Sequence, residues 1–484
     1  LHCRIAQALE GRFPHLAETQ PEVVAFHFTR GCLMEKAIEY WQRAAERSIK
    51  NSANPEAVAH LNNCLNLLGH LPENEEKRRL EMRLRIALAL PLIATRGYGA
   101  AEVYEVLSRA MDLCLEVGED TEIFRVLRLL WTFQTVRGDH GKARDAAQQV
   151  IVIAESRDAA DLRLEAYRVM GASLFYLGRM EEAGQYFTRA FELYDRQRYH
   201  SHVLIYGQDP GVGCLCNESL TLWFMGYPER AVARITEAVS LARALAHPYS
   251  LCYSLFHCSW LYLFLQDLRK VHESAEEMIL VSRHQTFAFW EMMGMILRGW
   301  VIAQDEEVDR GLATMKSGIA NWRGLGGGLY VPSLLSLVAD IHARQREVVA
   351  GLATVEEGLE VLKESGEAFC EPELYRLKGE LLWMQAVDSS ATWREAEECL
   401  ILAREKAAMQ ASKSLELRAA ISLSRLWLAQ GKQQAARQVL DETRRWFSEG
   451  TATHDLKRAD ELRAELALWA AGEAMGDGCT DRSL

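Results

Sequence analysis

The order of small and large apolar residues repeats along the chain at helical spacing. In one segment Gly178 is followed by Ala183, then by Phe187 and Ala190, and the last three positions share one face of an α-helix. The same order returns in the ranges 138–150, 226–238 and 431–443. No segment alternates strictly between apolar and polar residues over the length of a strand. The pattern therefore predicts a chain built from helices, without a sheet.

The repeats recur about every 34 to 45 residues, which is typical of tetratricopeptide-like helix pairs. Small residues are needed where two helices cross closely, and a large apolar residue fills the space beside them. We therefore expect an all-α fold, a tetratricopeptide-like helical-repeat superhelix (α-solenoid) of about ten helix pairs. Pro91 should kink or shorten a helix predicted over 75–94. The clearest units are expected at 121–156, 161–196, 212–246, 249–283, 287–322, 332–364, 371–409 and 415–447.

The length of the chain also favours an array. With 484 residues, of which 49% are hydrophobic, the chain exceeds one ordinary globular core, whereas repeats need to pack only on their neighbours. We expect residues 49–470 to form the superhelix and residues 471–484 to be a disordered tail. The chain begins at Leu1 and shows no secretory signal, so we expect it to be a piece of a larger protein.

Composition argues against several classes of partner. The 55 Lys and Arg against 67 Asp and Glu give a net charge of −12, which opposes direct binding to nucleic acid. No run of about 18 apolar residues is present, so no membrane span is expected. The 11 Cys show neither CxxC pairs nor Cys/His finger spacing. We expect reduced thiols in a cytoplasmic protein, without zinc or a disulfide framework.

Four phrases go beyond generic repeats: 35–44 (EKAIEYWQRA), 206–212 (YGQDPGV), 373–382 (ELYRLKGELL) and 414–423 (SLELRAAISL). Together they resemble the C-terminal repeat region of large bacterial signalling proteins. Those proteins join a class III adenylate/guanylate cyclase domain or a protein kinase domain to a STAND-type AAA ATPase. The resemblance implies that residues 1–48 are the end of an ATPase arm running into the first repeat. It also implies a sensor or scaffold module that controls the ATPase.

No stretch meets the requirements of a catalytic or cofactor site. The nearest approach to a P-loop, Gly311–Ser317, has Met where the second Gly belongs and lies on a predicted helix. Gly324–Gly328 is interpreted as a turn between repeats. His200 and His202 with Asp209 lack the spacing of a metal site and are interpreted as loop residues. We expect no catalytic residue, no cofactor, no metal and no enzyme activity in this chain.

An aromatic stripe is the strongest candidate for a binding site. Aligning Gly171, Ser219, Ser259 and Gly299 as helix-crossing positions places a series of aromatic residues on the inner helices. The pattern favours packing between neighbouring repeats and leaves a ligand-binding groove as the alternative. The stripe contains Phe175, Tyr176, Trp223, Phe224, Tyr253, Phe256, Trp260, Phe264 and Trp300, and the flanking units offer Arg125, Arg128, Asp340, Arg344, Glu373 and Arg376.

The connection from Tyr199 to Gly213 is long for a helical array, where connections usually take about 2 to 8 residues. It is interpreted either as a plug over exposed aromatic residues or as a lid on a binding site, and the plug is favoured. The residues expected to act in this way are Tyr206, Gln208, Asp209 and Pro210.

Three functions follow as hypotheses. The first is a non-catalytic sensor that binds a protein segment or the upstream ATPase or cyclase domains, acting by shifting the population of superhelix curvatures. The second is small-molecule sensing by an aromatic cavity, as in sugar-responsive activators of the same ATPase superfamily. In the third, the parent protein is itself an adenylate/guanylate cyclase or ATPase.

Overall fold

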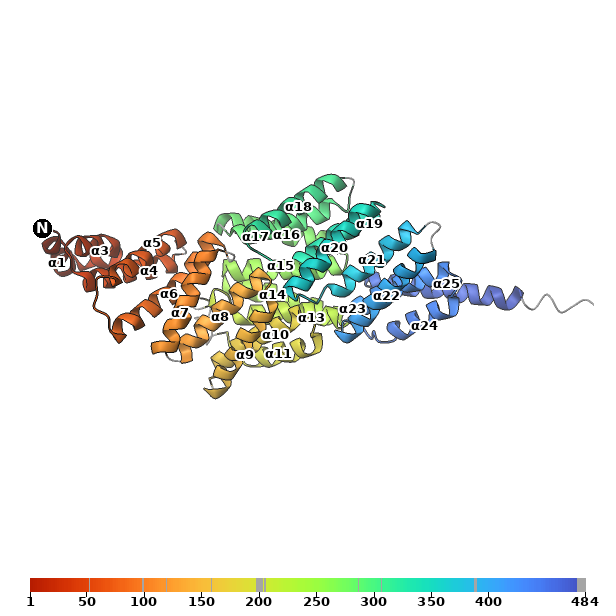
Figure 1. Cartoon of the computed structure of the whole chain (residues 1–484), viewed down its shortest axis with the longest axis horizontal. Helices are drawn as coiled ribbons and strands as arrows, with labels where there is room; N and C mark the ends of the chain where they lie inside the picture. Colours follow the sequence, from red (N-terminus) through yellow and green to blue (C-terminus); the bar gives the residue numbers. More distant parts are fainter. Residues whose placement is uncertain are drawn as a thin grey trace, which may run out of the picture. The chain divides into compact units, whose positions relative to one another are not determined.

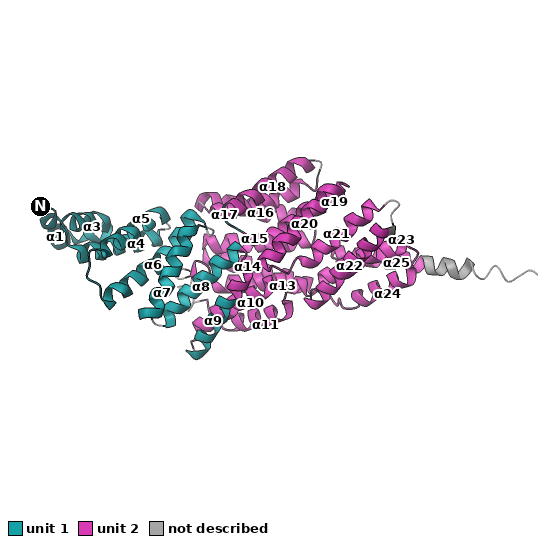
Figure 2. Ribbon diagram, viewed as in Figure 1, with its two compact units in different colours: residues 1–137, 145–157, 325–327 teal, residues 138–144, 158–324, 328–484 magenta. Residues whose placement is uncertain are grey.

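The structure is a computed structural model that describes residues 1–51, 53–97, 100–118, 120–157, 159–196, 203, 206–285, 287–305, 307–386 and 390–476. These residues form 24 helices and no strand, so the predicted all-α, tetratricopeptide-like repeat fold is confirmed. Figure 1 follows the helices in chain order. They divide into two compact units, which Figure 2 distinguishes by colour.

The first unit comprises residues 1–137, 145–157 and 325–327. Consecutive helices pack on one another around a core that includes Phe28, Leu61 and Leu88. Pro91 does not shorten its helix, which continues to Arg96, because burial of its apolar face outweighs the one backbone hydrogen bond that Pro91 cannot make. The helices are α1 (His2–Arg12), α2 (Pro14–Thr19), α3 (Pro21–Arg30), α4 (Met34–Lys50), α5 (Asn54–Leu68), α6 (Glu75–Arg96), α7 (Ala101–Val117), α8 (Asp120–Arg137) and most of α9 (His140–Ser156).

The second unit contains a series of helix pairs, each packed on the next. Their bounds agree within a few residues with the units expected from the sequence. The pairs are α10 (Ala160–Tyr176) with α11 (Met180–Glu192), α13 (Pro210–Phe224) with α14 (Pro228–Leu245), α15 (Pro248–Phe264) with α16 (Leu268–Gln285), α17 (Ala288–Ile302) with α18 (Val308–Gly324), α19 (Val331–Arg344) with α20 (Val348–Ser365), α21 (Glu371–Gln385) with α22 (Ser390–Met409), and α23 (Lys413–Ala429) with α24 (Gln433–Arg444).

The last described helix is α25 (His454–Gly476). The expected tail, 471–484, therefore begins inside a helix, and residues 477–484 lie outside the described residues. No described helix is both long and apolar enough to cross a membrane.

Small residues lie where the helices of a pair cross, as expected. A Cβ added at Gly171 would come within 2.8 Å of the Phe187 ring. The Ser219 hydroxyl donates a hydrogen bond to the carbonyl of Ala231 on the second helix of its pair, at 2.8 Å. In a later pair Ser424 donates in the same way to the Ala436 carbonyl, at 2.9 Å. The second helix thus approaches the first closely enough for a short side chain to reach its backbone.

At Gly311 the backbone of α18 comes close to the backbone at the end of α17. A Cβ there would lie 2.5 Å from the backbone nitrogen of Ala303 and 2.6 Å from the carbonyl oxygen of Gly299. We expect Gly311→Ala to lower the free energy of unfolding by about 1 to 3 kcal/mol, because backbone atoms cannot move aside as a side chain can. Gly324→Ala, on the same helix with no atom within 4 Å, is the matched control and should not destabilise. Urea denaturation curves compare the two, and equal midpoints would refute this reading of the crossing.

Within the second unit the chain returns on itself, so that α13 contacts α23. The Ser414 hydroxyl donates to the carbonyl of Trp223. Further along, the carboxylate of Glu449 accepts the backbone N–H groups of Glu229 and Arg230 at the start of α14, at 2.8 and 3.1 Å. We call this contact between Glu449 and the start of α14 the clasp. It closes one turn of the superhelix, because it joins positions 220 residues apart in the sequence.

Candidate functional site

The second unit contains a cavity of about 330 Å³. The first helices of successive pairs, from α13 to α23, wall it together with the segment before α21 and the start of α25. One part of the wall is aromatic and another is formed by charged side chains. The cavity lies on the concave side predicted for the first helices, but it extends well beyond the expected aromatic stripe.

The aromatic stripe is brought together as a connected cluster of rings. Phe175 contacts Phe224 with ring centroids 5.6 Å apart, and Trp223 stacks on Phe264 at 4.3 Å. Trp260 contacts Phe264 at 5.6 Å. Most of the stripe is therefore packed as core, which is the alternative the sequence favoured.

Nearly all of the stripe is buried, and only part of it faces the cavity. All nine predicted residues except Tyr253 and Phe264 are buried. The alternative that the sequence left open, a groove exposed along the stripe, is therefore not found, because other rings pack over the stripe. Only four members reach the cavity, namely Phe224, Trp260, Phe264 and Trp300, whereas Phe175, Tyr176, Trp223, Tyr253 and Phe256 do not line it.

Two rings from connecting segments cover the stripe, and the sequence did not single them out. Tyr330, just before α19, stacks on Trp260 with centroids 5.7 Å apart. Phe369, just before α21, stacks on Phe175 at 5.0 Å and also lines the cavity. Tyr330 adopts a φ of 65°, a conformation that non-glycine residues rarely take. It is held there by the buried carboxyl of Glu367, which accepts the Tyr330 N–H at 3.0 Å.

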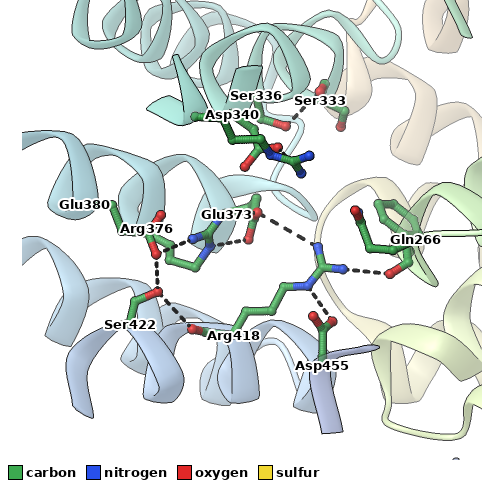
Figure 3. Close-up of polar contacts among 12 residues, drawn as sticks. Gln266, Ser333, Ser336, Asp340, Glu373, Arg376, Glu380, Arg418, Ser422 and Asp455 are labelled. Carbon is green, nitrogen blue, oxygen red and sulfur yellow. Dashed lines mark hydrogen bonds and ion pairs between the residues drawn. The ribbon is translucent and has the colours of Figure 1, made fainter. Parts of the chain in front are cut away.

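The charged part of the wall is centred on Arg376 of α21. Its guanidinium donates to both oxygens of Glu373, at 2.9 and 2.6 Å, and pairs with Glu380 at 2.8 Å. The Ser422 hydroxyl on α23 donates to Glu380 at 2.6 Å. The spacing of Glu373, Arg376 and Glu380 places them on one face of α21. Figure 3 shows these groups turned toward one another.

Arg418 of α23 ties three elements together (Figure 3). It donates to Asp455 of α25 at 2.7 Å and to the carbonyl of Phe264, at the end of α15, also at 2.7 Å. Its guanidinium lies over the Trp223 ring, 5.1 Å from the centroid. Arg418 therefore links the charged part of the cavity to the aromatic part.

The pKa values follow from this pairing. Burial opposes ionisation of Glu373, but the charge and hydrogen bonds of Arg376 outweigh it and hold the pKa of Glu373 below its ordinary value. Burial also opposes ionisation of Asp455, but the charge and hydrogen bond of Arg418 outweigh it and lower the pKa of Asp455 to about 2. Asp340 differs, since burial raises its pKa despite the neighbouring Arg344. Glu373 and Asp455 are thus fixed as carboxylates at neutral pH.

Equivalent positions in successive repeats explain how the wall changes character. The residue after the crossing position is Trp260 in α15 and Trp300 in α17, but Asp340 in α19 and Glu380 in α21. All four line the cavity. The sequence alignment had offered Asp340, Arg344, Glu373 and Arg376 as polar flanks of the stripe, and all four are in the wall. The register does not extend to α23, where the residue after the crossing residue Ser424 is the exposed Arg425, and Arg418 and Ser422 line the cavity instead.

The expected lid or plug is not at the cavity. Residues 197–202, 204 and 205 lie outside the described residues, and Pro210–Gly213 form the first turn of α13 rather than a loop. Asp209 caps that helix by accepting the Val212 N–H at 2.9 Å. Tyr206, Gln208 and Pro210 are buried beside it, and none of these described residues lines the cavity. Their role in covering a ligand remains a prediction without support from this geometry.

The other weak motifs have structural explanations. Gly311–Ser317 lies within α18, where Gly311 is the crossing residue described above. Gly328 belongs to the segment that leads to Tyr330 and approaches Gly138. His200 and His202 lie outside the described residues. Among the residues that the structure describes, no three His, Cys, Asp or Glu side chains gather as a metal site requires.

Comparison with known proteins adds little to this description. No protein-family model matches the chain. An uncharacterized protein of Rhizobium meliloti (strain 1021) is 23% identical over 381 residues, which cover 78% of this chain and 37% of the relative. This chain thus spans little more than a third of that relative's length.

Among solved structures, the Rap protein complexed with competence and sporulation factor aligns with a TM-score of 0.49 and 13% identity, covering 83% of this chain and 99% of that one. Yeast Tom70 aligns with a TM-score of 0.36 and 11% identity, covering 97% of each chain.

Proposed function

We propose that this chain is a non-catalytic sensor and interaction module whose ligand site is the cavity of the second unit. The cavity itself carries the proposal, because about 330 Å³ of space is walled by aromatic rings and by arginines held in ion pairs. Sites for small molecules usually measure about 300 to 1,000 Å³ and combine apolar walls with a few placed polar groups. A small molecule is therefore the first candidate for the ligand.

A protein segment is the second candidate. Met384 at the cavity is 43% exposed, and the side chain of Arg344 is 46% exposed. Both line the cavity, so its rim is open to solvent at the ends of α19 and α21. A side chain of a partner would enter at this rim, in keeping with the use of concave repeat surfaces for protein binding.

The clasp provides a way for ligand binding to reach other domains. The first helices from α13 to α23 and the start of α25 wall the cavity, and the clasp closes the same turn of the superhelix. A ligand that binds the closed turn better than an opened one would shift the population toward closure. We propose that this shift toward the closed turn regulates the upstream ATPase or cyclase domains that the sequence resemblance implies.

Filling the cavity tests the proposal. Leu337, a partly exposed residue of α19 in the wall, is replaced by Trp, and Val349, which is 79% exposed on α20, is replaced by Trp as the control. A small molecule present at about 100 times its Kd should stabilise the wild type and Val349→Trp by about 2.7 kcal/mol. Leu337→Trp should fold but show no such shift. Equal stabilisation of Leu337→Trp in thermal melts would show that the cavity is not the site.

A further inference from the structure

The ion pairs of the cavity leave one arginine unmatched. Arg344 pairs with Asp340 at 2.6 Å, Arg376 with two glutamates, and Arg418 with Asp455. Arg458, one turn beyond Asp455 on α25, also lines the cavity. It makes no hydrogen bond or ion pair with any residue that the structure describes. The wall thus presents a cation that its own carboxylates do not neutralise by contact.

The surroundings of Arg458 do not favour its charge. The side chain is partly buried, and burial together with the positive charges of Arg425 and Arg376 holds the pKa of Arg458 below its ordinary value. Glu380 and Asp455 attract it, but each is already paired with another arginine. A guanidinium remains protonated in proteins, so the charge of Arg458 can be neutralised by contact only if an anion binds beside it.

The remainder of the cavity favours an apolar, flat body. Phe224, Trp260, Phe264, Trp300 and Phe369 all line it, and aromatic faces stack well on planar groups. The polar groups nearest this wall are occupied, since Arg418 is hydrogen-bonded to the Phe264 carbonyl and Asp455. Arg458 is left as the group able to select a ligand by charge.

We propose that the cavity binds a small organic anion whose flat apolar body lies on the aromatic wall and whose carboxylate, sulfonate or phosphate group pairs with Arg458. The inference rests on the proposed function, since it names the chemical class of the ligand for the same cavity. A guanidinium presents two parallel N–H donors to such an acidic group, which adds orientation as well as affinity.

Two dyes with similar ring systems test the charge requirement in the full chain. The anion 1-anilinonaphthalene-8-sulfonate is compared with neutral N-phenyl-1-naphthylamine, which lacks the sulfonate, by fluorescence and by calorimetric stoichiometry. We expect the anion to bind at one site per chain, and Arg458→Gln to weaken it about tenfold without affecting the neutral dye. Arg269→Gln, at an arginine of α16 whose side chain is 73% exposed and lies outside the cavity, is the control and should bind both dyes as the wild type does.

The outcomes separate this inference from the proposed function. One-site binding of both dyes that Arg458→Gln leaves unchanged would overturn the anion requirement and leave the cavity as a ligand site. Failure of both dyes to bind the wild type, or binding that survives Leu337→Trp, would overturn the cavity proposal and this inference with it. Thermal melts of Arg458→Gln confirm that the variant is folded.

Discussion

Glu367→Ala is expected to lower the free energy of unfolding by about 3 to 5 kcal/mol. The Glu367 side chain is fully buried, and its carboxyl accepts the Tyr330 N–H at 3.0 Å and lies 3.4 Å from the imidazole of His140. Removing it leaves buried donors unsatisfied and releases Tyr330, whose left-handed backbone conformation depends on this contact. The ring of Tyr330 would then no longer be held over Trp260.

Urea denaturation monitored by tryptophan fluorescence measures the effect. Glu364→Ala, at an exposed glutamate on the preceding helix, is the control and should change stability by less than about 0.5 kcal/mol. Glu367→Gln keeps an acceptor oxygen and should fall between the two. A midpoint for Glu367→Ala equal to that of the control would contradict the anchoring role of Glu367.

Trp260→Ala is expected to cost about 3 to 5 kcal/mol, the full amount for a core aromatic residue. The sequence alone left room for a smaller loss, on the view that Trp260 lines an open groove. The structure gives the reason for revising this value, because Trp260 is 2% exposed and contacts Phe256, Phe264 and Tyr330. Removing the indole leaves a hole that the surrounding rings cannot fill.

The comparison variant for Trp260 is Met384→Ala. Met384 lines the same cavity but is 43% exposed at its rim, so its loss should cost less than about 1 kcal/mol. Thermal and urea unfolding of the two variants distinguish a packed wall from a loose one. A small loss for Trp260→Ala, similar to that for Met384→Ala, would mean that the aromatic wall is not core.

The sequence predicted the helix pairs well because the determinants are local. Gly178, Ala183 and Phe187 lie within one helix pair, so their spacing alone predicts that pair. The crossing residues Gly171 and Ser219 follow from the same local spacing. Local periodicity also located the inner helices. It therefore identified both the aromatic stripe and the first charged residues of the cavity wall.

The contacts that close the cavity could not be predicted from local periodicity. Ser414 reaches the Trp223 carbonyl across 191 residues, and Tyr176 contacts Tyr330 across 154. Tyr330 and Phe369 lie in connecting segments, where no helical period indicates which way a ring will turn. The position of the cavity depends on how far the superhelix curves, and that is set by many such distant contacts together.

Hydrogen exchange of the full chain, with and without 1-anilinonaphthalene-8-sulfonate, tests the central claim most directly. If the cavity is a ligand site coupled to the closed turn, protection should rise in α19, α21, α23 and the start of α25. It should rise as well at the clasp, in the peptides containing Glu229 and Glu449, although neither residue lines the cavity. Protection confined to exposed surface helices, or unchanged exchange in the cavity helices when the dye is bound, would contradict the account.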